Sequence, residues 1–391
     1  MEILGKKRER PRYRWSILFA SFFAFVAYAF AFQEAPPLIP LIIEEFNISH
    51  AEAGLMMSIV LVPGIFLSLP AGFFVERYGV RRVGFVSLVC IVLGSFVTAM
   101  ATSFVIILAG RLILGIGGTF IITTTPAIIA QWFAKEELGK AMGIYGVNMP
   151  FATVTAFPIA SVSMLAYGWR FPFYLSLAIG ITATAVFVAL IKEGPFSGHE
   201  RKVSARNAIG NFEIWKVGLV WLFFNAAALS FTTWASTLVE KYQNTSKVYA
   251  GFLASLLMWA AIFCVPLYGY MSDRTGKRRL FVFVGSLLMA LAFVALAFTS
   301  DLALITSILA LGVTAAMVPP IVATLPAEIL GPNLASVGFG ITGICLNIGA
   351  AVAQPLFGFL LDITKSYSFC LLGMATLSAI GAIVAYTLKT N

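Results

Sequence analysis

Charged residues are scarce in this chain of 391 residues. Asp, Glu, Lys and Arg together make up 11% of the sequence, whereas hydrophobic residues make up 60%. Soluble domains carry about 25% charged residues. This shortage of charge excludes an ordinary soluble domain and predicts a membrane protein.

Cysteine and histidine are also few. The four cysteines all lie inside apolar runs, and no pair has the spacing of a zinc site or indicates a disulfide framework. The two histidines, His50 and His199, fall in polar stretches between those runs. We therefore predict no metal and no other cofactor. No nucleophile–base set or phosphate loop appears in or beside the apolar runs, so we do not expect an enzyme.

The apolar runs themselves are numerous and long. Each is near or above the roughly 20 residues that a helix needs to cross a bilayer. We predict an all-α protein with twelve transmembrane helices, at residues 15–41, 53–75, 82–101, 104–130, 140–165, 171–191, 215–238, 249–271, 280–299, 302–326, 336–361 and 367–388.

Lys and Arg residues are distributed unevenly between the loops. If the N-terminus is cytoplasmic, 21 of the 26 lie on the cytoplasmic side. Four lie outside, namely Arg170, Lys241, Lys247 and Lys365, and Arg111 lies within a span. This asymmetry predicts that both termini are cytoplasmic, with the chain in the cell membrane. The net charge of +9 is thus a topology signal, and we expect no nucleic-acid partner.

One basic motif occurs twice, at an offset of 197 residues. The copies are GFFVERYGVRR at Gly72–Arg82 and GYMSDRTGKRR at Gly269–Arg279. A fixed period near half the chain length indicates a duplication. We therefore predict two halves, 1–191 and 215–391, each with six helices, joined by a cytoplasmic linker at 192–214.

Each copy has the composition of a tight loop between two membrane helices. We expect the first Gly to allow close helix contact, the acid to pair with loop arginines or cap the next helix, and the second Gly to turn the chain. The residues that we assign to these gating loops are Gly72, Glu76, Arg77, Gly79, Arg81, Arg82, Gly269, Asp273, Arg274, Gly276, Lys277, Arg278 and Arg279.

These loops resemble the signature loop of the major facilitator superfamily, Gly-x-x-x-Asp-Arg-x-Gly-Arg/Lys-Arg/Lys. The second copy fits fully, whereas the first has Glu76 in place of Asp and Val80 before its basic pair. The resemblance covers essentially the whole chain. It implies two six-helix bundles that transport a solute by alternating access.

Ionisable residues deep in a bilayer are costly and usually have a function. Glu34 and Arg111 are the two well inside predicted spans, at a similar depth, so a pair between them would relieve the cost of burial. Glu328 and Asp362 lie at span ends, where an interfacial position is the simpler interpretation. We predict that Glu34 and Arg111 carry proton coupling.

Arg111 begins the sequence Arg-Leu-Ile-Leu-Gly-Ile-Gly-Gly, which looks like a motif of the superfamily's fourth helix that is associated with proton coupling. A structural clamp of Arg111 on backbone carbonyls is the alternative. Pro36, Pro37 and Pro40 interrupt the outer end of the first span, either as a simple helix end or as part of a gate.

Neutral polar residues near the middle of the spans are candidates for substrate contact, because transporter sites lie between repeats near mid-bilayer. Each alone can instead be a bond between helices. With Arg111 included, the predicted substrate-binding set is Tyr28, Gln33, Arg111, Tyr145, Asn148, Asn225, Trp234, Trp259, Asn347 and Gln354.

These features together predict a proton-coupled secondary transporter of a small organic solute. The arginine favours an organic anion. The fifth span lacks the drug–proton antiporter pattern, and the sugar-porter signatures are absent. A uniporter or exchanger without proton coupling is the alternative, and a transporter-like sensor or scaffold is a third reading. The expected partners are the substrate, protons and the lipid bilayer, and we expect a monomer.

Overall fold

A computed structural model describes residues 10–192, 194, 206–299, 301–331 and 334–389. Within these residues the chain is helical and has no strand. Twelve stretches are long and apolar enough to cross a membrane, which confirms the predicted all-α fold. Most of the predicted linker lies outside the described residues.

The first half contains six spans. Its helices are α2 (Arg10–Gln33), η1 (Pro36–Leu38), α3 (Ile39–Phe46), α4 (His50–Ser58), α5 (Val62–Tyr78), α6 (Val80–Ala99), α7 (Phe104–Trp132), α8 (Lys135–Tyr145), α9 (Asn148–Tyr167) and α10 (Arg170–Leu190). Several spans are therefore built from two consecutive helices, as α4 and α5 are.

The second half repeats the pattern after a short helix, α11 (Arg206–Ile209). Its helices are α12 (Phe212–Gln243), α13 (Lys247–Thr275), α14 (Arg278–Ala297), α15 (Asp301–Ala315), α16 (Pro319–Val322), α17 (Leu325–Leu330), α18 (Ala335–Thr364) and α19 (Tyr367–Tyr386). Adding 197 to the last residues of α3 and α5 gives those of α12 and α13, so the sequence offset is also a structural one.

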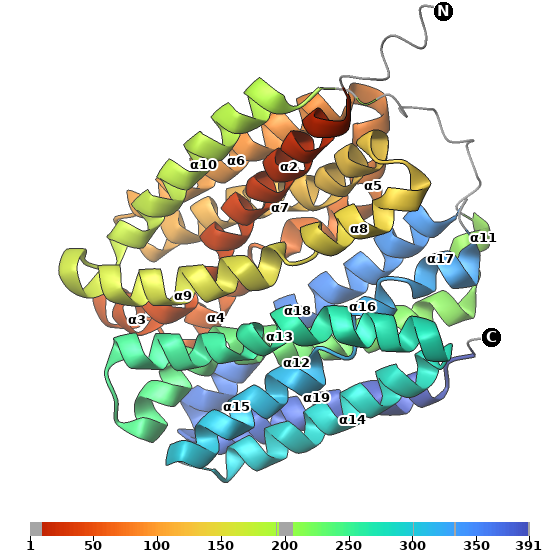
Figure 1. Cartoon of the computed structure of the whole chain (residues 1–391). Helices are drawn as coiled ribbons and strands as arrows, with labels where there is room; N and C mark the ends of the chain where they lie inside the picture. The colour runs from red at the N-terminus through yellow and green to blue at the C-terminus, as the bar shows by residue number, and fades with distance from the viewer. Residues whose placement is uncertain (1–9, 193, 195–205, 300, 332–333, 390–391) are drawn as a thin grey trace, which may run out of the picture.

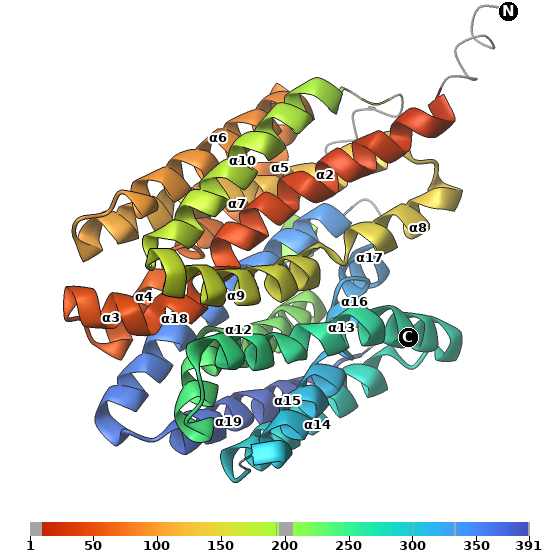
Figure 2. The ribbon, with the colours of Figure 1, turned by 60° about the vertical axis from the view of Figure 1, so that its left-hand side comes forward.

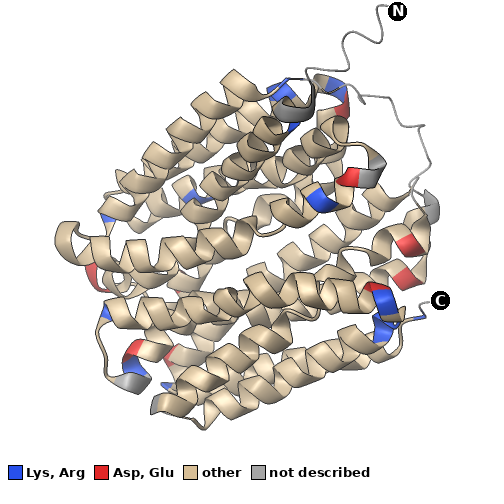
Figure 3. Cartoon of the chain, in the orientation of Figure 1, with Lys and Arg blue, Asp and Glu red and all other residues tan. Residues whose placement is uncertain are grey.

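The two halves lie side by side, and both ends of the chain lie at the same end of the molecule (Figures 1 and 2). We call this the inner end, following the predicted orientation, and the opposite end the outer end. Charged residues gather toward these two ends, and the middle of the bundle is almost free of them (Figure 3). The apolar middle matches a bilayer core, where charge is expensive.

The two halves meet along two main seams. Helices α4 and α5 pack against α18, and α9 packs against α13. These pairs are equivalent under the 197-residue offset. The seam between α4–α5 and α18 extends from His50 against Gly358 at the outer end to Leu69 against Gly340 toward the inner end.

Candidate functional site

The first span is interrupted at the level of the candidate site. Helix α2 ends at Gln33, a 3-10 turn follows at Pro36–Leu38, and α3 resumes the helix at Ile39. In a continuous helix the carbonyl of Phe32 would accept a bond from the N–H of residue 36, but proline has none. The prolines therefore leave backbone carbonyls that need another donor.

Arg111, on α7, supplies that donor. Its Nη1 donates to the carbonyl of Ala31 at 2.7 Å and its Nη2 to the carbonyl of Phe32 at 3.2 Å. Nη2 also lies 3.3 Å from the sulfur of Met57. The side chain is 1% exposed. The structure thus places the guanidinium on the end of a broken helix, where its charge also complements the helix dipole.

Glu34 lies beside this clamp and is completely buried. Neither carboxyl oxygen has a hydrogen-bond partner among the described residues. The hydroxyl of Ser176, on α10, faces the carboxyl, while it donates its own bond to the carbonyl of Phe173 at 3.0 Å.

The expected pairing of Glu34 with Arg111 is only partly realised. The two groups are close enough to interact electrostatically, which fits the common depth expected from the sequence. They form no ion pair in the described part of the chain. The carbonyls of Ala31 and Phe32 at the end of α2 take the guanidinium instead, which is the clamp alternative.

Other predicted site residues of the first half bond to neighbouring helices. Gln33 Nε2 donates to Thr153 Oγ1 at 2.9 Å, and the hydroxyls of Tyr145 and Thr125 lie 2.6 Å apart. Tyr28 packs tightly against Gly118, where a Cβ would lie 2.0 Å from its ring. Asn148 is buried at the first position of α9. These contacts join α2, α7, α8 and α9 within one half.

In the second half, two predicted residues form one connection. Trp234 Nε1 donates to the carbonyl of Gln354 at 3.3 Å, which ties α12 to α18. The amide oxygen of Gln354 lies 3.5 Å from the hydroxyl of Ser58 in the first half. Gln354 therefore contacts both halves.

The remaining three predicted residues are placed differently. Asn225 donates to the carbonyl of Trp221 in its own helix. Asn347 packs against Gly64 across the seam, so it takes part in contact between the halves. Trp259 is 41% exposed. It lies on α13 together with the exposed side chains of Phe252, Phe263 and Tyr270. The structure does not bring Trp259 to the buried residues.

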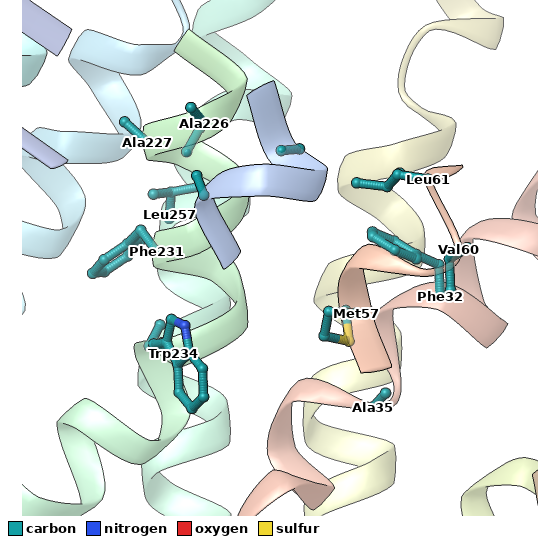
Figure 4. Close-up of a cluster of buried hydrophobic side chains, with 14 of the residues drawn as sticks. Phe32, Ala35, Met57, Val60, Leu61, Ala226, Ala227, Phe231, Trp234 and Leu257 are labelled. Atoms are coloured by element: carbon teal, nitrogen blue, oxygen red, sulfur yellow. The ribbon is translucent and has the colours of Figure 1, made fainter. Parts of the chain in front are cut away.

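Buried apolar side chains lie at this level in both halves (Figure 4). Phe32, Met57 and Leu61 approach from the first half, and Trp234, Phe231 and Leu257 belong to the second. We call these six residues the central apolar cluster. It lies directly next to the Arg111 clamp, because Phe32 and Met57 contact that guanidinium.

The gating loops differ between the halves. In the second, Arg278 pairs with Asp273 at 2.6 Å and with Glu328 at 2.6 Å. Glu76, the acid of the first loop, forms no hydrogen bond or ion pair among the described residues. Among the described residues, the acid–base contacts of these loops thus stay within the second half and do not cross to the first.

The glycines of these loops confirm one expectation and correct another. Gly79 and Gly276 have φ of 81° and 67°, so the second Gly of each copy does turn the chain. The first Gly does not mark a close helix contact. A Cβ at Gly72 would meet no atom within 4 Å, and one at Gly269 would meet only Pro320 at 3.5 Å.

The contact between two outer-end residues, His50 and Asp362, was not predicted from the sequence. Asp362 was expected to be a simple boundary residue, but its carboxylate bonds to His50 in the other half. The sequence Ser49-x-x-Glu52, which forms a capping box in the structure, was the available signal that a helix begins at His50. Among the described residues, no three His, Cys, Asp or Glu side chains come together as a metal-binding group.

Comparison with known proteins agrees with this architecture. The family model of the Major Facilitator Superfamily matches residues 17–245 and 219–391. The chain therefore belongs to the major facilitator superfamily, and it is an integral membrane transporter rather than an enzyme.

The chain is 27% identical over 277 residues to the nitrite extrusion protein of Bacillus subtilis, covering 69% of this chain and 68% of that protein. It is 23% identical to the probable sulfoacetate transporter SauU of Cupriavidus necator, covering 88% and 87%. Its fold matches the crystal structure of a bacterial homologue of the human lysosomal transporter Spinster, in an inward-facing and occupied conformation, with a TM-score of 0.79 at 17% identity over 96% of both chains.

Proposed function

We propose that this transporter couples the movement of protons to that of a small organic anion. The observation that carries the proposal is the burial of Glu34, whose two carboxyl oxygens have no hydrogen-bond partner among the described residues. A buried, unpaired carboxylate is very costly, whereas a protonated carboxyl is neutral. Glu34 therefore holds a proton in this conformation, and Ser176 supplies an oxygen that can accept its O–H.

Loss of this proton would change the contacts of Arg111. A negative Glu34 attracts the guanidinium and competes with the carbonyls of Ala31 and Phe32 for it. Those carbonyls form the joint between α2 and η1, and η1 packs against α12 of the second half. Protonation of Glu34 therefore biases the contact between the halves, as coupling requires.

The same charges favour an anion as substrate. With Glu34 neutral, the buried side chains of Glu34 and Arg111 together carry one net positive charge, that of Arg111. This charge lies next to the central apolar cluster. An anion that enters there balances the charge, and an organic body suits the apolar side chains. The names of two relatives also refer to anions, nitrite and sulfoacetate.

Reconstituted protein tests the proposal in two steps. A thermal-shift screen with nitrite, nitrate, sulfoacetate and small carboxylates finds an anion that stabilises the protein. Proteoliposomes then report its uptake with and without an imposed pH gradient. We expect Glu34→Gln to retain exchange of the anion and to lose accumulation driven by the gradient.

Glu45→Gln is the matched control, because Glu45 is an outer-end carboxylate that pairs with Arg170 at 2.8 Å within the first half. It should accumulate the anion as the wild type does. Accumulation by Glu34→Gln at the wild-type level would show that the proton carrier lies elsewhere. Wild-type uptake that ignores the pH gradient would instead support a uniporter or exchanger.

A further inference from the structure

The outer ends of the two seams between the halves are built to the same pattern. On one seam, a Cβ at Gly54 would meet Gln354 and Pro355 at 2.6 Å. On the other, a Cβ at Gly251 would meet Ser161 at 1.9 Å, with Phe157 nearby. Gly54 and Gly251 are equivalent under the 197-residue offset, as are Phe157 and Gln354. At each seam the two halves thus come into close contact at a glycine, which lies on α4 in one seam and on α13 in the other.

The helices α4 and α13 also begin in the same way. Ser49 and Ser246 are equivalent N-cap residues, and each side chain accepts a bond from the amide three residues later. A helix start leaves further amides without partners inside the helix. In α4 the next amides to satisfy are those of His50 and Ala51.

Asp362, on α18, satisfies both of these amides from the other half of the molecule. Its Oδ1 accepts from the amide of His50 at 3.2 Å, and its Oδ2 accepts from the amide of Ala51 at 3.0 Å. The Nδ1 of His50 also lies 2.7 Å from Oδ1. A carboxylate at a helix N-terminus gains from the positive end of the dipole as well as from the bonds.

The equivalent position on the other seam has no such group. Residue 165 is a leucine, and its side chain is 61% exposed. The helix of that seam equivalent to α4 is α13, which begins at Lys247, the counterpart of His50. Among the described residues, the outer closure is therefore asymmetric, with a charged cross-link on the Asp362 seam and none on the other.

We infer that Asp362 is a latch that holds the outer end of the transporter shut. The carboxylate completes the N-terminal cap of α4 only while the halves touch. Opening the outer end separates α18 from α4, and this leaves two amides and a carboxylate to be hydrated. Asp362 thus stabilises the outer-closed state relative to the outer-open state.

The latch also lies close to the central apolar cluster. The ring of His50 is 5.9 Å from that of Trp234, and Trp234 bonds to the carbonyl of Gln354 on the same helix as Asp362. A solute that moves Trp234 would therefore act on the elements that carry the latch. No other titratable or charged side chain of the described residues bonds to His50.

Distances between spin labels at the outer ends of the two halves test the latch. Labels at Thr102→Cys and Asn244→Cys lie in outer loops of different halves, in a background where Cys90, Cys264, Cys345 and Cys370 are replaced by serine. Asp362→Ala should raise the ratio of long to short distances by at least about tenfold, because it removes three bonds to a charged group. His50→Gln should have a smaller effect, since both backbone bonds remain.

Two further variants keep the test decisive. Glu45→Gln removes an outer carboxylate paired within one half, so it should leave the distances unchanged. Leu165→Asp introduces a carboxylate at the position of the other seam equivalent to Asp362, and it should shift the distances toward the closed state. The labelled protein is measured without substrate or pH gradient, so the result is independent of proton coupling. Unchanged distances in both Asp362→Ala and Leu165→Asp would overturn the latch.

Discussion

The opening helix of the first half is broken, whereas its counterpart in the second half is continuous. Helix α2 stops at Gln33 before Pro36 and Pro37, but α12 runs unbroken over 32 residues. The residues of α12 equivalent to those prolines are Thr233 and Trp234, which both have an N–H to donate. Among the described residues, a helix break that frees backbone carbonyls at this level therefore occurs only in the first half.

The residues around the break differ accordingly. The counterpart of Arg111 is Ile308, and the counterpart of Glu34 is Phe231, and both are almost fully buried. An unbroken helix needs no guanidinium at its middle, so an apolar side chain suffices there. Arg111 thus satisfies the carbonyls that the break frees, whereas neither carboxyl oxygen of Glu34 has a hydrogen-bond partner among the described residues.

Replacing Arg111 by its counterpart should have the largest effect. Arg111→Ile leaves the carbonyls of Ala31 and Phe32 without donors, at about 1–3 kcal/mol for each buried group. We expect a large loss of thermal stability in detergent and loss of transport. Ile308→Val in the second half is the matched control and should cost about 0.5–1.5 kcal/mol. Similar stabilities of the two variants would contradict the clamp.

Removing a proline from the break in the first span should recover part of the stability that Arg111→Ile loses. Pro36→Ala restores an N–H that can bond to the carbonyl of Phe32, so it should be less harmful, or beneficial, when Arg111 is already isoleucine. We expect a coupling of about 1 kcal/mol in a double-mutant cycle on unfolding temperature. Additive effects of the two substitutions would mean that the proline and the arginine do not act on the same carbonyl.

Substitutions in the gating loops should have the smallest effect on stability. Asp273→Asn removes one of two partners of Arg278, while Glu328 keeps the other. Because this partly exposed network stays within the second half, its loss should change stability by less than about 1 kcal/mol. Glu76→Gln should be neutral. Thermal unfolding in detergent checks both stabilities. Spin-label distances at the inner end should also stay unchanged, and a large shift with Asp273→Asn would support a gate between the halves.

The sequence by itself determined the fold and its duplication. Apolar runs long enough for a bilayer, the charge asymmetry of the loops and the repeat at 197 residues all come from local composition, which a membrane constrains strongly. It also identified Glu34 and Arg111, since few ionisable residues lie inside the spans. The positive φ of Gly79 and Gly276 follows from the motif as well.

Only the tertiary structure decided what these residues contact. Whether Arg111 meets Glu34 or the carbonyls of α2 depends on where the chain breaks in space and which groups it leaves without donors. The bond of Asp362 to α4 joins residues more than 300 positions apart, and nothing in the local sequence around either one specifies the other. Hydrogen bonds act over about 3 Å, so the packing of the two halves selects these partners.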